Sequence, residues 1–98
     1  MEIKKNQNGD ALEIALIGRL DTTTAPMLET EVKENLGDVK NLTFDFAELE
    51  YISSAGLRVL LAAQKIMNVN GKMVIKNANS DIMDVFEITG FSDILTIE

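Results

Sequence analysis

The run Tyr51–Leu61, with the sequence YISSAGLRVLL, is the most informative stretch of this 98-residue chain. A short apolar approach ends at Ser53 and Ser54, and a helical pattern of leucines begins directly after them. Serine favours the first position of a helix because its hydroxyl oxygen accepts a hydrogen bond from a first-turn amide. The run therefore predicts a strand-to-helix junction with two serines near the surface.

Strand and helix patterns alternate outward from this junction. We predict strands at residues 3–7, 12–17, 42–46, 72–76 and 94–97, and helices at about 25–36, 55–68 and 81–89. Asn8-Gly9 is a strong hairpin signal, whereas strands joined through a helix should run parallel. The fold class is therefore α/β, a single domain over residues 1–98. Its sheet is mixed, mostly parallel and four- to five-stranded, with helices packed on it.

Apolar spacing also predicts which residues of each helix face the sheet. The predicted inward residues are Ala25, Leu28, Val32 and Leu36 in the first helix, Leu57, Leu60, Leu61 and Ile66 in the second, and Ile82, Val85, Phe86 and Thr89 in the third. Met27 and Met83 fall outside these faces, so we expect them in an exposed apolar patch.

Composition excludes several classes of function. The chain has no Cys, no His and no Trp, which argues against thiol chemistry, histidine catalysis and the common zinc sites. We therefore predict no enzyme, no catalytic or metal-binding residue and no cofactor. A net charge of −7 argues against binding nucleic acid or an anionic membrane. With neither a membrane span nor an apolar leader in the sequence, we expect a cytoplasmic protein.

The two serines allow two interpretations. A phosphoryl group on Ser53 or Ser54 would be tolerated at a helix start and would add about −1.5 to −2 charges to the surface, as a switch that blocks a partner requires. Alternatively, both serines only cap the helix. Gly56, in the first helical turn, is explained either by close approach of a partner or by a tight contact with a neighbouring strand.

The segment Asp21-Thr22-Thr23-Thr24 is a second candidate surface, at the entry to the first predicted helix. Asp and Thr are helix-capping residues, so a purely structural role is the alternative. Arg58 lies one turn after Ser54 on the polar stripe of the second helix, and we expect it to contribute to binding a partner.

Three segments together resemble the STAS domain, and most closely the bacterial anti-sigma factor antagonists: Gly18–Asp21 with Thr24-Ala25, then Leu42–Phe46, then Tyr51–Leu61. The resemblance covers nearly the whole chain. It implies that the unphosphorylated protein binds an anti-sigma factor, a serine kinase of the histidine-kinase-like ATPase fold, and frees the sigma factor. Phosphorylation would block that binding, and a PP2C-type phosphatase would reverse it.

Aligned on Gly56-Leu57, the phosphorylated serine of the family falls on Ser54. An Asp of the family is replaced by Ser53, which leaves Ser53 as a rival site, and a following Ser or Thr is replaced by Ala55. Many members of the family have one more helix after the last strand, and we expect that helix to be absent here.

The resemblance assigns a set of partner-binding residues and leaves one alternative function open. The expected partner-binding residues are Asp21, Thr22, Thr23, Thr24, Ser53, Gly56 and Arg58. We expect a monomer. The alternative is a STAS adaptor without a phosphorylation cycle, as a subunit of a lipid-transport or stressosome-like complex.

Overall fold

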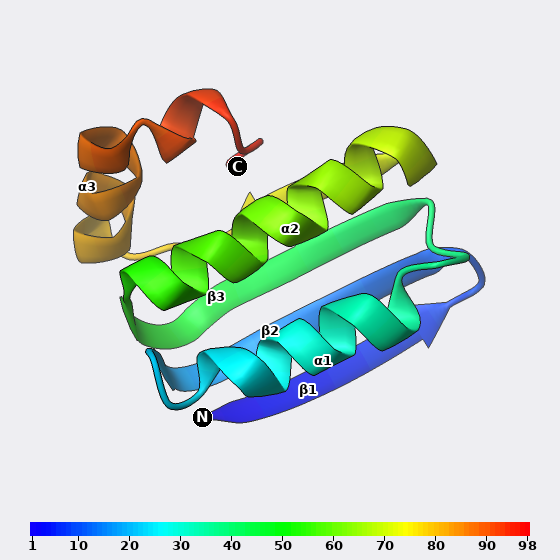
Figure 1. Cartoon of the computed structure of the whole chain (residues 1–98), viewed down its shortest axis with the longest axis horizontal. Helices are drawn as coiled ribbons and strands as arrows, with labels where there is room; N and C mark the ends of the chain where they lie inside the picture. The colour runs from blue at the N-terminus through cyan, green and yellow to red at the C-terminus, as the bar shows by residue number, and fades with distance from the viewer.

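The computed structural model describes all residues from Met1 to Glu98. The predicted order of strands and helices is confirmed as far as the third helix (Figure 1). The elements are β1 Glu2–Asn8, β2 Ala11–Leu20, α1 Ala25–Asn35, β3 Asn41–Ile52, α2 Ser54–Asn70, β4 Lys72–Lys76, α3 Ser80–Thr89 and the 3-10 turn η1 Phe91–Asp93. None of the helices is long and apolar enough to span a membrane.

The sheet has four strands in the order β1-β2-β3-β4. β1 and β2 form the predicted antiparallel hairpin, with Gly9 at a φ of +65° in its turn. β2, β3 and β4 are mutually parallel, so the predicted mixed, mostly parallel sheet is confirmed. The β2–β3 register shifts twice, between Ala15 and Ile17 and between Gly18 and Arg19.

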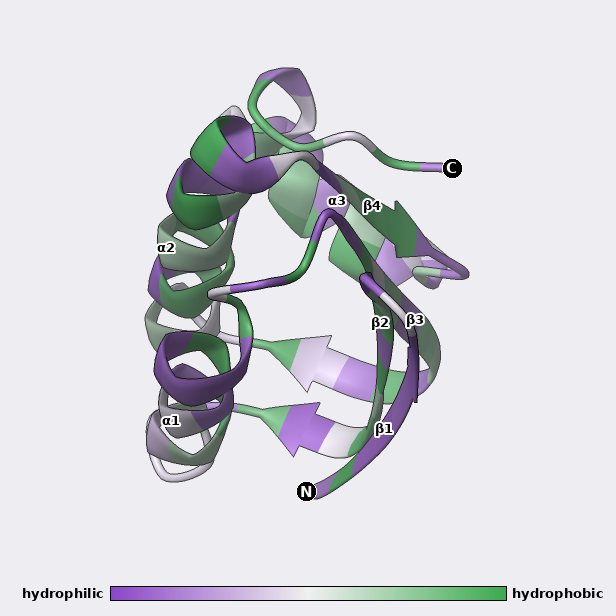
Figure 2. Cartoon of the chain, turned by 90° about the vertical axis from the view of Figure 1, so that its right-hand side faces the viewer, coloured by the Kyte–Doolittle hydropathy of each residue, from purple (hydrophilic) through white to green (hydrophobic).

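Both long helices cover the same face of the sheet, and the opposite face is left open (Figure 2). Alternation along the strands produces this arrangement, because Leu42, Phe44 and Phe46 of β3 are buried while the residues between them are partly exposed. The rings of Phe44 and Phe46 lie 5.9 Å apart at the centre of the core. Ala25, Leu28, Val32 and Leu36 are all buried, as predicted for the first helix.

The predicted last strand, residues 94–97, is wrong. The chain continues after α3 into η1, where the Leu95 amide donates to the Phe91 carbonyl. Only Ile97 reaches the edge of β4, where it forms a single parallel bridge with Ile75. Gly90 ends α3 in the left-handed conformation, with φ +81°, as its position predicted.

Some predicted inward residues are also wrong. The buried side of α2 is centred on Leu60, Ala63 and Met67, so Leu61 and Ile66 lie at its margins and are only half-buried. In α3, Thr89 is exposed and its hydroxyl donates to the Val85 carbonyl instead of facing the sheet.

The two methionines differ in their outcome. Met27 is 46% exposed, as predicted for an apolar residue outside the inward face of its helix. Met83 is half-buried and packs against the core, so the prediction of an exposed patch there is wrong. The predicted inward face of α3 was therefore too narrow on the side that carries Met83.

Candidate functional site

Ser53 is the N-cap of α2, and its polar groups are occupied. Its Oγ accepts a hydrogen bond from the Gly56 amide at 3.4 Å, and its carbonyl accepts one from the Leu57 amide at 3.0 Å. Its own amide donates to the Leu20 carbonyl at 2.9 Å. The residue is half-buried. Ser53 therefore has the capping role that was one of the two interpretations of the serine pair.

Ser54 differs from Ser53 in both exposure and bonding. It is the first residue of α2 and is exposed, and its hydroxyl has no hydrogen-bond partner within the protein. No acidic side chain lies in the first turn of α2. An added anion at Ser54 would thus meet the positive end of the helix dipole and no neighbouring carboxylate of that turn.

Gly56 is buried where the first turn of α2 crosses the ends of β2 and β3. A Cβ atom at this position would lie 2.7 Å from Leu20 Cγ and 3.0 Å from Ile52 Cγ1. Such distances are too short for unstrained packing, so a glycine is required for the helix to approach the sheet this closely. The structure thus supports the packing explanation of Gly56, and burial leaves this residue little surface to offer a partner.

Asp21 organises the turn that leads into α1. Its Oδ1 accepts hydrogen bonds from the amides of Thr23 and Thr24, at 3.0 and 3.1 Å, and from the Thr23 hydroxyl at 2.7 Å. The Thr23 hydroxyl, with these two amides, holds the pKa of Asp21 below its ordinary value of 3.8. The carboxylate is therefore charged at neutral pH and fixes the shape of this turn.

Thr24 closes the turn, whereas Thr22 is free. The Thr24 hydroxyl accepts from the Asp21 amide and donates to the Arg19 carbonyl, each at 2.8 Å. Thr24 is also the N-cap of α1, although its side chain caps none of the helix amides. Thr22 is exposed and its hydroxyl has no protein partner, so within this turn it is free to contact another molecule.

The Asp21 turn and the Ser53-Ser54 junction lie at the same end of the sheet (Figure 1). Neighbouring parallel strands finish at the same end of a sheet. Here β2 leads into the Asp21 turn and β3 leads into the Ser53-Ser54 junction. The bond from the Ser53 amide to the Leu20 carbonyl connects them directly. The structure therefore brings the two predicted surfaces together.

Two residues of this region were missed from the sequence. The guanidinium of Arg19 lies over the ring of Tyr51, 4.3 Å from its centre, and Arg19 Nε is 3.9 Å from Asp21 Oδ2. Arg19 and Tyr51 each lie two residues before a predicted site residue, on strands that pair with each other. Period-two spacing could have placed each residue on the same side of its strand as a site residue, but their cation–π contact depends on the strand register.

Arg58 lies one helical turn after Ser54 and is exposed. The five ion pairs of the structure involve other residues, so the Arg58 guanidinium has no carboxylate partner. A side chain at this position shares a helix face with Ser54 because residues four apart are neighbours.

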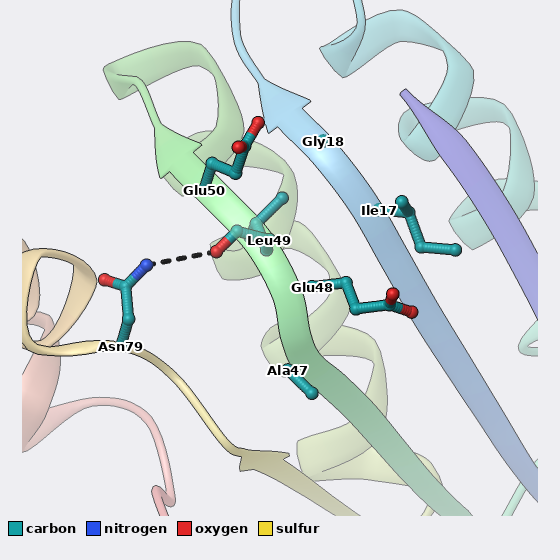
Figure 3. A pocket seen from close by; sticks show the side chains of 7 residues that line it. All are labelled: Ile17, Gly18, Ala47, Glu48, Leu49, Glu50 and Asn79. Atoms are coloured by element: carbon teal, nitrogen blue, oxygen red, sulfur yellow. Dashed lines mark hydrogen bonds between the residues drawn. The ribbon is translucent and has the colours of Figure 1, made fainter.

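The largest hollow, about 520 Å³, lies away from the serines on the open face of the sheet (Figure 3). The residues lining it are Ile17, Gly18, Ala47, Glu48, Leu49, Glu50 and Asn79. Both polar atoms of the Asn79 side chain are hydrogen-bonded there, because its Nδ2 donates to the Leu49 carbonyl and its Oδ1 accepts from the Ile82 amide and caps α3. No three His, Cys, Asp or Glu side chains gather anywhere in the structure to form a metal site.

This geometry defines a small α/β binding domain that presents a free serine hydroxyl at a helix start, beside a rigid acidic turn. The chain belongs to the STAS domain family, whose family model matches residues 2–98. The anti-sigma-B factor antagonist of Listeria monocytogenes is 31% identical over 100 residues, which cover 96% of this chain and 84% of that protein. The predicted family is therefore confirmed.

Solved structures of similar proteins confirm the fold. The crystal structure of an anti-sigma factor antagonist from Mycobacterium paratuberculosis superposes with a TM-score of 0.88 at 18% identity, over 98% of this chain and 83% of that one. The anti-sigma factor antagonist SpoIIAA in its unphosphorylated form gives a TM-score of 0.79 at 18% identity, over 99% and 87% of the two chains.

Proposed function

We propose that this protein is an anti-sigma factor antagonist controlled by phosphorylation of Ser54. In the unphosphorylated form it binds an anti-sigma factor that is also a serine kinase, and the sigma factor is released. The observation that carries the proposal is the exposed, unbonded hydroxyl of Ser54 at the start of α2, next to the Asp21 turn. Relatives named anti-sigma factor antagonists support it, and one of them, SpoIIAA, has been solved in a phosphorylated form.

Ser54 is a better phosphoryl acceptor than Ser53 on structural grounds. A kinase must reach the hydroxyl and remove its proton, and Ser54 is exposed and unbonded. Modifying Ser53 would instead remove the N-cap bond to Gly56 and insert charge at a half-buried position against the end of β2. We therefore assign Ser54 as the phosphorylation site and Ser53 as the cap that holds the helix start in place.

The switch requires two group transfers, both performed by partners. Ser54 Oγ attacks the γ-phosphorus of ATP on the kinase, the new P–O bond forms, and the bond to the leaving ADP breaks. The hydroxyl proton passes to a base of the kinase. In the reverse step, a PP2C-type phosphatase uses water to release inorganic phosphate and restore the serine. Our protein thus supplies an acceptor and a docking surface, and it is not an enzyme.

The docking surface combines the residues that the fold brings to this end of the sheet. Thr22, Thr23 and Ser54 offer exposed hydroxyls, and Asp21 fixes the conformation of the turn beside them. Arg58 adds a free cation one turn along α2. We propose that the protein acts as a monomer in the bacterial cytoplasm, where sigma factors act.

The proposal can be tested by capturing partners from lysate of the native host with three baits. These are the wild type, Ser54→Asp and, as a matched control, Ser92→Asp, which changes another exposed serine located in η1. We expect an ATPase-fold anti-sigma factor to bind the wild type and the control but not Ser54→Asp. The same partners on all three baits would contradict the switch and favour the adaptor function.

A further inference from the structure

The net side-chain charge of α2 is opposite in sign to those of α1 and α3. α2 contains Arg58 and Lys65 and no Asp or Glu, which gives it a charge of +2 from side chains. In contrast, α1 has three Glu and one Lys, and α3 has two Asp, one Glu and no base. In a chain with a net charge of −7, α2 is thus the helix that carries basic side chains and no acidic ones.

The two cations of α2 lie on one outward strip that begins at Ser54. Five residues define this α2 strip at helical spacing: Ser54, Arg58, Leu61, Ala62 and Lys65. All of them are exposed except Leu61, which is half-buried. Neither Arg58 nor Lys65 takes part in an ion pair of the structure. The strip therefore presents two free cations around a small apolar spot.

We propose that the α2 strip docks onto an acidic, partly apolar surface of the anti-sigma factor, and that phosphoserine 54 binds Arg58 within the helix and so removes this cation from the strip. The inference rests on the function proposed above and adds the chemistry of the partner surface and the way the phosphate acts. A phosphoserine carries about −1.5 to −2 charges near neutral pH, which exceeds the single positive charge of Arg58.

Helix geometry favours this internal pair. The Cβ atoms of residues four apart lie about 5–6 Å from each other. The favourable order has the acidic residue first and the basic residue four positions after it. A guanidinium binds phosphate oxygens through two parallel N–H donors, which an ammonium does not. Phosphorylation would thus add negative charge at the docking surface and also occupy the cation that the partner needs.

The internal pair can be measured without any partner. Phosphoserine is incorporated at position 54, and the pH midpoint of the 31P resonance is recorded for the phosphorylated wild type and three variants. Pairing with Arg58 favours the dianion, so Arg58→Gln should raise the midpoint by about 0.2–0.4 pH unit. Arg58→Lys should restore part of the difference. Lys65→Gln, about 16 Å along the helix from Ser54, should leave the midpoint unchanged.

An unchanged midpoint in Arg58→Gln would overturn the internal pair. The chemistry of the partner surface is tested by the affinity of the unphosphorylated protein for the anti-sigma factor, measured by calorimetry. Arg58→Glu and Lys65→Glu should each weaken binding by about tenfold or more. The control is Lys72→Glu, which changes an exposed, unpaired lysine of β4 and should alter the affinity less than about twofold.

The outcomes separate the two proposals. If the wild type binds no anti-sigma factor at all, the proposed function fails. If it binds one, and both α2 variants bind as tightly as the wild type, the function stands and the acidic partner surface is contradicted. Strongly weakened binding in the Lys72→Glu control would also contradict it, because the effect would then follow net charge and not the strip.

Discussion

The Ser53 amide donates a hydrogen bond to the Leu20 carbonyl at 2.9 Å and so joins the end of β3 to the end of β2. Each of these strand ends leads directly into a candidate surface, the Ser53-Ser54 junction in one case and the Asp21 turn in the other. A partner that touches the Ser54 hydroxyl therefore meets the Asp21 turn in a fixed relative position.

Replacing Ser54 by Asp should leave the fold intact. The side chain is exposed and unbonded, and a carboxylate at a helix start interacts favourably with the helix dipole. We expect the free energy of unfolding in urea to stay within about 0.5 kcal/mol of the wild-type value. A much larger loss of stability would show that Ser54 is a structural residue, and lost binding could then no longer be assigned to charge.

Replacing Ser53 by Ala should lower the stability of the protein but leave its phosphorylation intact. Loss of the N-cap bond to Gly56 should lower the free energy of unfolding by about 0.5–1 kcal/mol, while phosphorylation by the partner kinase continues. In Ser54→Ala, stability should be retained and phosphorylation lost. Mass spectrometry after incubation with kinase and ATP measures the second effect, and phosphate found on Ser53 of the wild type would reverse our assignment.

Gly56→Ala should destabilise the protein although alanine is the better helix former. The new methyl group would lie 2.7 Å from Leu20 Cγ, so we expect a loss of about 1–3 kcal/mol in urea unfolding. Gly37→Ala is the matched control, because a Cβ atom there has no neighbour within 4 Å. Equal stabilities of the two variants would mean that the α2–sheet contact is looser than the structure shows.

Acid should weaken the fold partly through Asp21 and Asp45, whose pKa values are both lowered in the folded state. At Asp21 the main cause of the lowered pKa is the hydrogen bond from the Thr23 hydroxyl. At Asp45 it is the bond from the Asn77 side-chain amide, followed by the bond from the Ala47 backbone amide. A lowered pKa gives stability that is present above the ordinary value of 3.8 and is lost as the pH falls through the folded value.

Urea unfolding at pH 7, 4 and 3 measures this effect. We expect Asp21→Asn and Asp45→Asn each to lose less stability than the wild type between pH 4 and pH 3, because each removes one of the two carboxylates whose pKa is lowered by folding. Stability that falls equally steeply in all three proteins would show that other groups dominate acid unfolding.

Much of the fold could be predicted because local signals agree with the final packing. Asn8-Gly9 encodes the hairpin, and the alternation from Leu42 to Phe46 encodes a half-buried strand. The last strand could not be predicted well, since residues 94–97 are apolar enough for a strand but the turn after Gly90 keeps Leu95 bonded to Phe91. That choice depends on where α3 places the chain end, which no local pattern records.

The candidate site shows a similar division. That Asp21 and Ser54 share one end of the sheet follows from parallel strand order alone. The stacking of Arg19 on Tyr51 depends on the two register shifts between β2 and β3, which sequence spacing does not reveal. The different states of Ser53 and Ser54 also required the structure, because either serine could have been the cap.

The affinity of the anti-sigma factor for this protein with and without phosphoserine at position 54 tests the central claim most directly. Calorimetry on the purified pair should show tight binding to the unmodified protein and a loss of at least about a hundredfold on phosphorylation, because a like charge facing an acidic partner surface costs several kcal/mol. Circular dichroism should show the same fold in both forms. Equal affinity for the two forms would contradict the account and leave Ser54 as an exposed residue without a switching role.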